Sequence, residues 1–376
     1  MKKPIHCNII FGNNTDPHLS QIFAGYQMLQ DQKILRYDVS FNPQYINDNY
    51  IHNVLIEVNF NNRIRICYDL SDGYQSFLDM EKFDKILDSV DFYFKRSNNI
   101  EKNKILKNRN KIKTLGFNYP VSCKNNYFDK FFFTSYNIQK IKKYINYLRF
   151  EKGNHKELFY QNFENKSNDQ NQEDYKILFS VRLWDPEKLK LENIKNGFPN
   201  LTSIDASHLL EKWRNDYNQV TLERINQVRI LKDYFGENFV GGVSKSPYST
   251  KIASDIIAPY EIVNKSNYMQ LIKGNFICVA NRGLHHSIPW KFGEYIAASR
   301  AIVTETLAYE TTGNFQEGKN YLTFDTSEKL LEQTKYLIEN PKIIHQLEKN
   351  NQDYYQEFLR PDQLIMRTLD FLLIEA

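Results

Sequence analysis

Cysteine is scarce and dispersed in this sequence of 376 residues. The four cysteines stand apart, at Cys7, Cys67, Cys123 and Cys278, and no CxxC pair occurs. Structural zinc sites need such closely spaced ligands, so their absence argues against a zinc-stabilised fold. Isolated cysteines without a disulfide pattern also favour a reduced, cytoplasmic protein.

Long apolar runs are absent as well. The sequence has no stretch of about 18 apolar residues, so no segment predicts a transmembrane helix. The opening residues "MKKPIHCNIIFGNN" become polar after Phe11. This apolar run is too short for the core of a secretory signal peptide, and we expect it to form a first strand instead.

The composition is that of a globular protein with an uneven charge. Hydrophobic residues make up 41% and aromatic residues 14%, enough for ordinary cores and too much for a disordered chain. Residues 1–150 hold 22 Lys and Arg against 14 Asp and Glu, a net charge of +8, and the remainder carries −4. A basic half suits an anionic membrane surface or an acidic substrate.

Apolar periodicity predicts two α/β domains, which is also what the length favours. In the first half the pattern predicts helices over 20–32 and 80–90, and strands over 7–12, 34–41, 53–60, 63–70 and 91–95. The polar segment 162–174 has no periodicity and is typical of a linker. We therefore expect an amino-terminal domain over 1–160, a linker over 161–175 and a second domain over 176–376.

Strands and helices alternate more regularly in the second half. The predicted strands are 177–183, 238–243, 275–281, 301–305 and 320–324, and the predicted helices are 219–235, 266–274, one from 290, and closing helices over 327–340, 341–358 and 362–375. Such alternation is typical of a parallel, doubly wound sheet. The expected fold is thus two Rossmann-like domains facing a cleft, with ligands bound beyond the carboxyl ends of the strands.

The segment "NRGLHHSIPWK" follows a predicted strand and precedes a predicted helix, so it should lie at the mouth of a ligand-binding site. It contains Gly283, the pair His285 and His286, and Ser287. We expect Ser287 to cap the helix, leaving free amides that favour an anion such as a diphosphate. Adjacent histidines in a loop are often only polar surface. At this mouth they are also candidates to stabilise a leaving diphosphate, and with no third ligand nearby we expect no metal.

Two charged residues follow within the predicted helix. Lys291 would add a point charge beside the diphosphate. Glu294 lies about one turn into the helix, where its carboxylate can accept hydrogen bonds from paired sugar hydroxyls. The plainer alternative is an ion pair between Glu294 and Lys291 on a solvated helix face.

The stretch from Phe276 to Asn340 resembles the carboxyl-terminal nucleotide-binding domain of GT-B glycosyltransferases of the group 1 type. The resemblance lies in "KFGEYIAASRAIVTE" and "EGKNYLTFDTSEKLLEQTKYLIENP". It implies that Glu294 binds a nucleotide ribose. The segment "FSVRLWDPEK" is similar to the one where this family places an Arg and a Lys near the diphosphate, which would be Arg182 and Lys188.

The resemblance implies an enzyme that transfers a sugar from a nucleotide-diphosphate donor to an acceptor hydroxyl. The acceptor would be a glycan or lipid-linked glycan, as in surface polysaccharide biosynthesis. No cofactor is implied, because the nucleotide-sugar is the donor substrate. The carboxyl-terminal domain would hold the donor, and the amino-terminal domain would hold the acceptor.

Two loops of the first half offer a base to deprotonate the acceptor hydroxyl, as inverting members of the family require. The loop "GNNTDPHLS" carries Asp16 and His18, and "YDLSDGY" carries Asp69 and Asp72. Asp-Pro and Asp-Gly are also common turn sequences, so both loops have a purely structural explanation. His286 is a further catalytic candidate from the ligand mouth.

The run from Lys95 to Lys113 holds eight basic residues and one acidic residue. A solvated helix or loop is the plainer explanation. Peripheral docking on an anionic inner membrane face is the alternative, and it would suit a lipid-linked acceptor. The run has few aromatic residues, which disfavours binding to nucleic acid.

Two other functions fit the same pattern. A nucleotide-sugar epimerase would use the same architecture without an acceptor. A non-catalytic nucleotide-binding protein is the second alternative. Retaining members of the family often carry a second Glu at the position eight residues before Glu294, and here that residue is His286.

Overall fold

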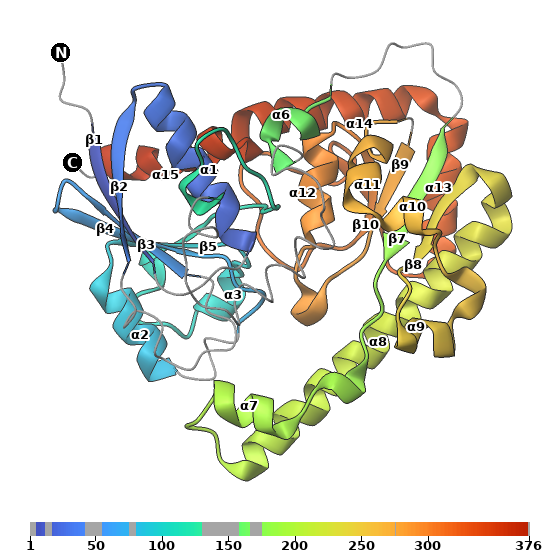
Figure 1. Cartoon of the computed structure of the whole chain (residues 1–376), viewed down its shortest axis with the longest axis horizontal. Coiled ribbons are helices and arrows are strands. Elements are labelled where there is room, and N and C mark those ends of the chain that lie inside the picture. The colour runs from blue at the N-terminus through green and yellow to red at the C-terminus, as the bar shows by residue number, and fades with distance from the viewer. Residues whose placement is uncertain are drawn as a thin grey trace.

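The structure is a computed structural model that describes residues 5–11, 17–41, 55–74, 80–129, 158–165, 175–274 and 276–374. It contains two separate sheets, each with helices packed against it, lying side by side (Figure 1). The predicted fold class is confirmed: the chain forms two Rossmann-like α/β domains in a GT-B arrangement.

The first sheet has six strands in the order β2-β1-β3-β4-β5-β6. Its elements are β1 (Ile5–Phe11), η1 (Pro17–Leu19), α1 (Ser20–Asp31), β2 (Leu35–Phe41), β3 (Leu55–Phe60), β4 (Ile64–Asp69), α2 (Met80–Ser89), β5 (Phe92–Lys95), α3 (Ile100–Asn103), η4 (Arg109–Lys111) and β6 (Ile112–Thr114). β3 runs antiparallel to both β1 and β4, so the first sheet is mixed. All the other pairings in it are parallel.

The second sheet has five strands in the order β11-β10-β9-β7-β8, and every pairing is parallel. Its strands are β7 (Lys176–Val181), β8 (Phe239–Val243), β9 (Phe276–Ala280), β10 (Ala301–Glu305) and β11 (Tyr321–Phe324). All five lie within one or two residues of the predicted strands. The strands could be predicted from the sequence because their side chains are apolar and buried. β9, for example, is buried at every position.

The connections of the second domain are mainly helical. They comprise η6 (Pro186–Lys188), α7 (Leu191–Gly197), α8 (Ser203–Phe235), η7 (Gly236–Asn238), α9 (Pro247–Ile252), η8 (Ser254–Ile256), α10 (Tyr260–Val263), α11 (Lys265–Leu271), η9 (Leu284–His286), α12 (Trp290–Ala297), α13 (Ser327–Glu339) and α14 (Pro341–Tyr354). α8 begins at Ser203 rather than at the predicted residue 219. With α7 it forms an arm that extends from the second sheet in Figure 1 and has a small core of its own, which includes Phe198 and Trp213.

The end of the chain crosses back to the first domain. After α14 come the π-helix η10 (Tyr355–Leu359) and α15 (Pro361–Ile374), and Figure 1 shows them running across the molecule. Leu364, Ile365 and Leu369 of α15 belong to the same core as Ile22 and Phe23 of α1. The last helix therefore packs with the first sheet, although the predicted second domain extended to residue 376.

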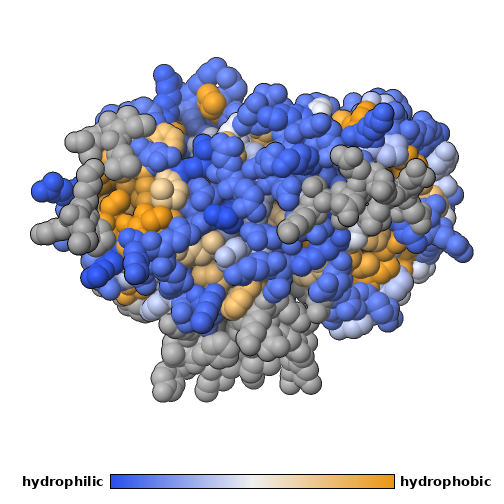
Figure 2. Space-filling model, turned by 90° about the horizontal axis from the view of Figure 1, so that it is seen from above, coloured by the Kyte–Doolittle hydropathy of each residue, from blue (hydrophilic) through white to orange (hydrophobic). Residues whose placement is uncertain are grey.

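The predicted linker falls largely outside the described residues, which stop at 165 and resume at 175. Just before this gap lies the short helix α6 (Tyr160–Phe163). Figure 2 shows a face that is mainly hydrophilic, with smaller hydrophobic patches toward its two ends. Within the described ranges, every helix is too short or too polar to traverse a lipid bilayer.

The basic run 95–113 does not form one solvated segment. Lys95 and Arg96 are buried at the end of β5, and both make ion pairs. Further along, Lys104 is exposed and pairs with Glu101, and Lys111 donates to main-chain oxygens near the end of α2. The basic surface available to a membrane is therefore smaller than the sequence indicates, and membrane docking stays a prediction.

Candidate functional site

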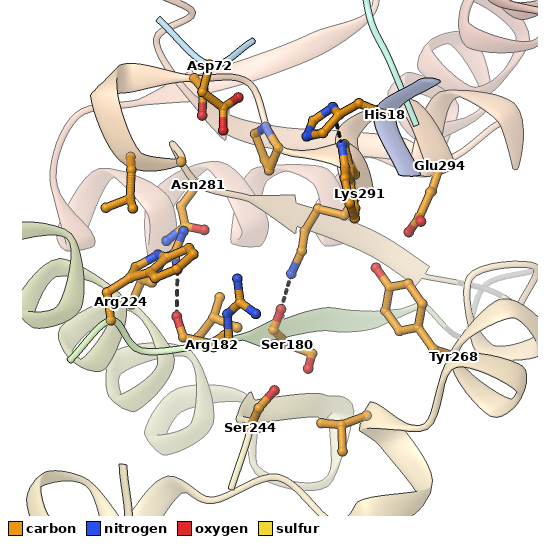
Figure 3. Close-up of a pocket in the computed structure, with 18 of the residues that line it drawn as sticks. His18, Asp72, Ser180, Arg182, Arg224, Ser244, Tyr268, Asn281, Lys291 and Glu294 are labelled. Carbon is orange, nitrogen blue, oxygen red and sulfur yellow. Dashed lines mark hydrogen bonds between the residues drawn. The ribbon is translucent and has the colours of Figure 1, made fainter. Parts of the chain in front are cut away.

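The order of strands in the second sheet indicates where a ligand would bind. From β7 the chain passes first to β8 on one side and then to β9 on the other, so the strand order reverses between β7 and β9. Ligands of open parallel sheets bind beyond the carboxyl ends of the strands at such a reversal. A cavity of about 570 Å³ lies there, and we call it the interdomain cavity because both domains line it (Figure 3).

The floor of the interdomain cavity is held together by Arg224 of α8. Its Nη1 donates to the main-chain oxygen of Arg182 after β7 at 2.6 Å, and its Nη2 donates to that of Arg282 after β9 at 2.9 Å. Arg224 is only 6% exposed. Its Nε has no hydrogen-bond partner in the described part of the chain. Burial lowers the pKa of Arg224 to about 10, so the guanidinium is charged at neutral pH and favours an anion in the cavity.

Arg182 and Lys291 add two more cations to the lining of the interdomain cavity. The guanidinium of Arg182 stacks on the ring of Trp184, with its Cζ 4.3 Å from the ring centre. Lys291, in the first turn of α12, donates from Nζ to the main-chain oxygen of Ser180. The stacking and the hydrogen bond fix both side chains beside the carboxyl end of β7, so the lining is strongly positive on this side.

Glu294 lines the interdomain cavity from α12, one turn after Lys291, and is 3% exposed. Figure 3 shows its carboxylate on the same side of the cavity as Tyr268, with Lys291 between it and Arg182. Glu294 is thus buried in the cavity wall and does not lie on a solvated helix face. Its binding role stays a prediction.

The turn before α12 differs from the expected cap. The helix begins at Trp290, its N-cap is Pro289, and no side chain caps it. Ser287 instead closes the preceding turn: its main-chain oxygen accepts from the amide of Gly283 at 2.7 Å. A Cβ at Gly283 would lie 2.4 Å from Oγ of Ser287, so a larger residue here would force the serine hydroxyl to rotate away. Both Gly283 and Ser287 line the cavity.

The first domain supplies a linked polar group to the opposite wall. Arg96 donates from Nη2 to Oδ1 of Asp72 at 2.8 Å and to the main-chain oxygen of Ile288 at 2.7 Å. Its Nη1 lies 2.8 Å from Nδ1 of His18, and Nε1 of Trp290 lies 2.8 Å from the same atom. Oδ1 of Asn118 lies 2.7 Å from the same nitrogen, so Nδ1 of His18 is the meeting point of polar side chains from both domains.

Of the other predicted bases, Asp69 lies away from the interdomain cavity and Asp16 lies outside the described residues. Asp69 is buried at the end of β4, where it accepts from Nζ of Lys95 at 2.6 Å and from the hydroxyl of Tyr93 at 2.8 Å. Burial alone would raise the pKa of Asp69, but Lys95 and these hydrogen bonds outweigh it and hold the pKa below its usual value. A carboxylate held ionised in this way is structural, which corrects the prediction of a base at Asp69.

Three other predicted residues also lie outside the interdomain cavity. Lys188 is exposed, because the chain turns away at Asp185 and forms η6. His286 is exposed. His285 packs on the ring of Trp213 at 5.3 Å, and its amide donates to Oδ2 of Asp216 at 2.9 Å.

Sequence reasoning missed two cations of the cavity, Arg96 and Arg224. Arg96 was counted only as part of the basic run, and Arg224 occupies an ordinary position in an amphipathic helix. The signal that could have found Arg96 is its place directly after a buried strand, at the carboxyl edge of the first sheet. Among the described residues, no three His, Cys, Asp or Glu side chains cluster as a metal site would require.

No family model matches the chain, and no curated protein matches it. Among solved structures, it is similar to the crystal structure of the carboxyl-terminal domain of a glycosyl transferase group 1 family protein, LpcC, from Francisella tularensis. The two share 13% sequence identity with a TM-score of 0.33, and the alignment covers 52% of this chain and 95% of that domain.

Proposed function

We propose that the protein is a glycosyltransferase that uses a nucleotide-diphosphate sugar as donor. One observation carries the proposal: the interdomain cavity combines three cations, Arg182, Arg224 and Lys291, with the buried carboxylate of Glu294. A nucleotide-diphosphate sugar has two groups that match these side chains. Its anionic diphosphate suits the three cations, and the paired hydroxyls of its ribose suit the carboxylate. The volume of about 570 Å³ is within the usual range for small-molecule sites.

In this proposal the second domain binds the donor. Arg182, Arg224 and Lys291 neutralise the diphosphate, and Glu294 accepts hydrogen bonds from the ribose hydroxyls. The same cations stabilise the charge that develops on the diphosphate as it leaves. Their hydrogen bonds to main-chain oxygens and the stacking on Trp184 hold them in place before the donor binds.

The first domain supplies the base. Asp72 is 38% exposed and faces the cavity, so its carboxylate is within reach of an acceptor hydroxyl. It takes the proton as the hydroxyl oxygen bonds to the sugar carbon and the bond from that carbon to the diphosphate oxygen breaks. His18 lines the same wall and is placed to hydrogen-bond to the donor sugar or the acceptor.

The test begins with nucleoside diphosphates. Thermal unfolding is measured with millimolar uridine, guanosine, cytidine and thymidine diphosphates, and at least one should raise the melting temperature. The matching nucleotide-sugars are then incubated with the protein, with and without candidate glycan acceptors. Release of nucleoside diphosphate that depends on an acceptor supports the proposal. Conversion of the donor sugar without an acceptor indicates an epimerase, and no shift with any nucleotide contradicts nucleotide binding.

A further inference from the structure

A second cavity, of about 300 Å³, lies where three parts of the chain meet. β5 and β6 of the first sheet line one side, α15 lines another, and Thr312, from the segment after β10, completes it. We call it the junction cavity. It shares no lining residue with the interdomain cavity.

The junction cavity has two cations and no carboxylate in its lining. Nζ of Lys113 lies 5.7 Å from the ring centre of Phe371, and Cζ of Arg367 lies 4.1 Å from that of Phe358. Within the described part of the chain, neither cation makes an ion pair. Asp370, on the same helix as Arg367, is exposed and is not part of the lining.

This lack of a counter-charge is unusual for the protein. Lys95, which is buried nearby, is paired with Asp69 at 2.6 Å, and Arg300 is paired with Glu348 at 3.2 Å. Two cations that line one cavity repel each other, and an anion bound between them would offset that repulsion. The charge of the junction cavity therefore favours an anionic ligand.

The remaining lining is amphipathic. Phe94 and Leu115 are buried apolar residues of the cavity wall, and Phe371 is partly exposed at 36%. The hydroxyl oxygen of Thr114 accepts from Nδ2 of Asn98 at 2.8 Å, which leaves its hydrogen for a ligand oxygen. The cavity thus offers two cations and a hydroxyl donor beside an apolar wall.

We propose that the junction cavity is a binding site for a small anionic ligand that carries one phosphate or carboxylate on an aromatic or short aliphatic group. Lys113 and Arg367 hold the anion, and Phe94 and Phe371 contact the apolar group. Because the cavity is separate from the interdomain cavity, this site does not depend on the proposed transferase function.

Calorimetric titration with phenyl phosphate tests the proposal, with inorganic phosphate and phenol as partial probes. The wild type should bind one phenyl phosphate more tightly than either partial probe. Lys113→Gln and Arg367→Gln should each weaken binding by about tenfold or more, because each removes a charge-assisted contact. Lys107→Gln is the matched control, since Lys107 is exposed and lies outside the cavity lining. Arg182→Gln should also leave binding unchanged, which separates this site from the interdomain cavity.

Several results would overturn the proposal. These are no binding of phenyl phosphate to the wild type, unchanged affinity in both cavity variants, and loss of binding in Arg182→Gln. Vesicles containing phosphatidic acid distinguish a lipid headgroup site: binding to vesicles without binding to phenyl phosphate also overturns it. Two cavity variants are used so that a folding defect in one, checked by thermal unfolding, does not decide the outcome.

Discussion

The indole Nε1 of Trp290 donates a hydrogen bond of 2.8 Å to Nδ1 of His18. The bond joins α12 of the second domain to η1 of the first, and the two rings also pack edge to face with their centres 4.5 Å apart. Arg96 completes the contact by reaching from His18 to the main-chain oxygen of Ile288. The two domains are therefore linked directly at the interdomain cavity, which is where a donor and an acceptor would have to meet.

Trp290→Phe removes this link and should lower the free energy of unfolding. Trp184→Phe is the matched control: it is also half-buried and lines the cavity, but its Nε1 has no hydrogen-bond partner in the described part of the chain. The hydrogen bond of Trp290 should make its substitution costlier by about 0.5–1.5 kcal/mol. Urea unfolding of both variants measures the difference, and an equal loss in the two would contradict the link.

Asp69→Asn should mainly lower stability, whereas Asp72→Asn should mainly lower transfer activity. Asp69→Asn leaves the buried Lys95 without a charge partner and should cost about 3–5 kcal/mol of unfolding free energy. The contribution of Asp69 is present above its ordinary pKa of 3.8 and is lost as pH falls through its lower folded-state pKa. Asp72→Asn also removes the charge partner of a buried cation, Arg96, but Asp72 is 38% exposed and Arg96 keeps its hydrogen bonds to main-chain oxygens, so the cost should be smaller, about 1–3 kcal/mol.

The same pair of variants tests the assignment of the base. Asp72→Asn should reduce sugar transfer by about 100-fold or more while the protein stays folded. Urea unfolding and an assay of nucleoside diphosphate release provide the two measurements. Full transfer activity in Asp72→Asn would contradict its role as the base. Undiminished stability in Asp69→Asn would contradict the structural role of Asp69.

His285 should make the stability depend on pH. Burial lowers the pKa of His285 and outweighs the opposing effect of Asp216, so the unfolded chain binds this proton more readily than the folded one. Unfolding free energy should then fall as pH decreases through about 6.5, by up to about 1.4 kcal/mol per pH unit from this group.

His285→Asn should remove that part of the slope in urea unfolding between about pH 5 and 7.5. Asparagine suits the site, because His285 has a φ of +58°, a conformation that asparagine tolerates well. His286→Asn controls for the backbone, since its φ is also +58° and its side chain is exposed. A slope in His285→Asn equal to that of the wild type would rule out this source of pH dependence.

The sequence predicted the second domain well because its strands are continuous apolar runs between polar loops. β9 and β10 match their predicted ranges within a residue at each end. The start of α8 was missed because residues 203–218 expose many polar side chains, and much of their apolar face packs on the small α7 core. Nothing in the last 16 residues indicates that α15 packs on α1, because an amphipathic helix does not specify its partner.

Sequence predicts a site residue well when the local succession of strand, loop and helix determines where that residue lies. Glu294 and Lys291 face the interdomain cavity because both lie at the start of a helix that follows a strand of a parallel sheet. Arg96 and Arg224 reach the same cavity through tertiary contacts, to His18 and to the main chain of Arg182, that no sequence pattern encodes. Lys188 was misplaced because the chain turns away at Asp185, although the residue type matched the resemblance.

The contact between Glu294 and a ribose can be tested by comparing a nucleoside diphosphate with its 2′,3′-dideoxy form. Calorimetry should show that the wild type prefers the ribose form by about tenfold or more, since two hydroxyl contacts to a buried carboxylate are lost in the other. Glu294→Ala should bind both forms with nearly equal affinity, and Glu332→Ala, on exposed α13 surface, should keep the wild-type preference. If Glu294→Ala retains the full preference for ribose, the central claim is wrong.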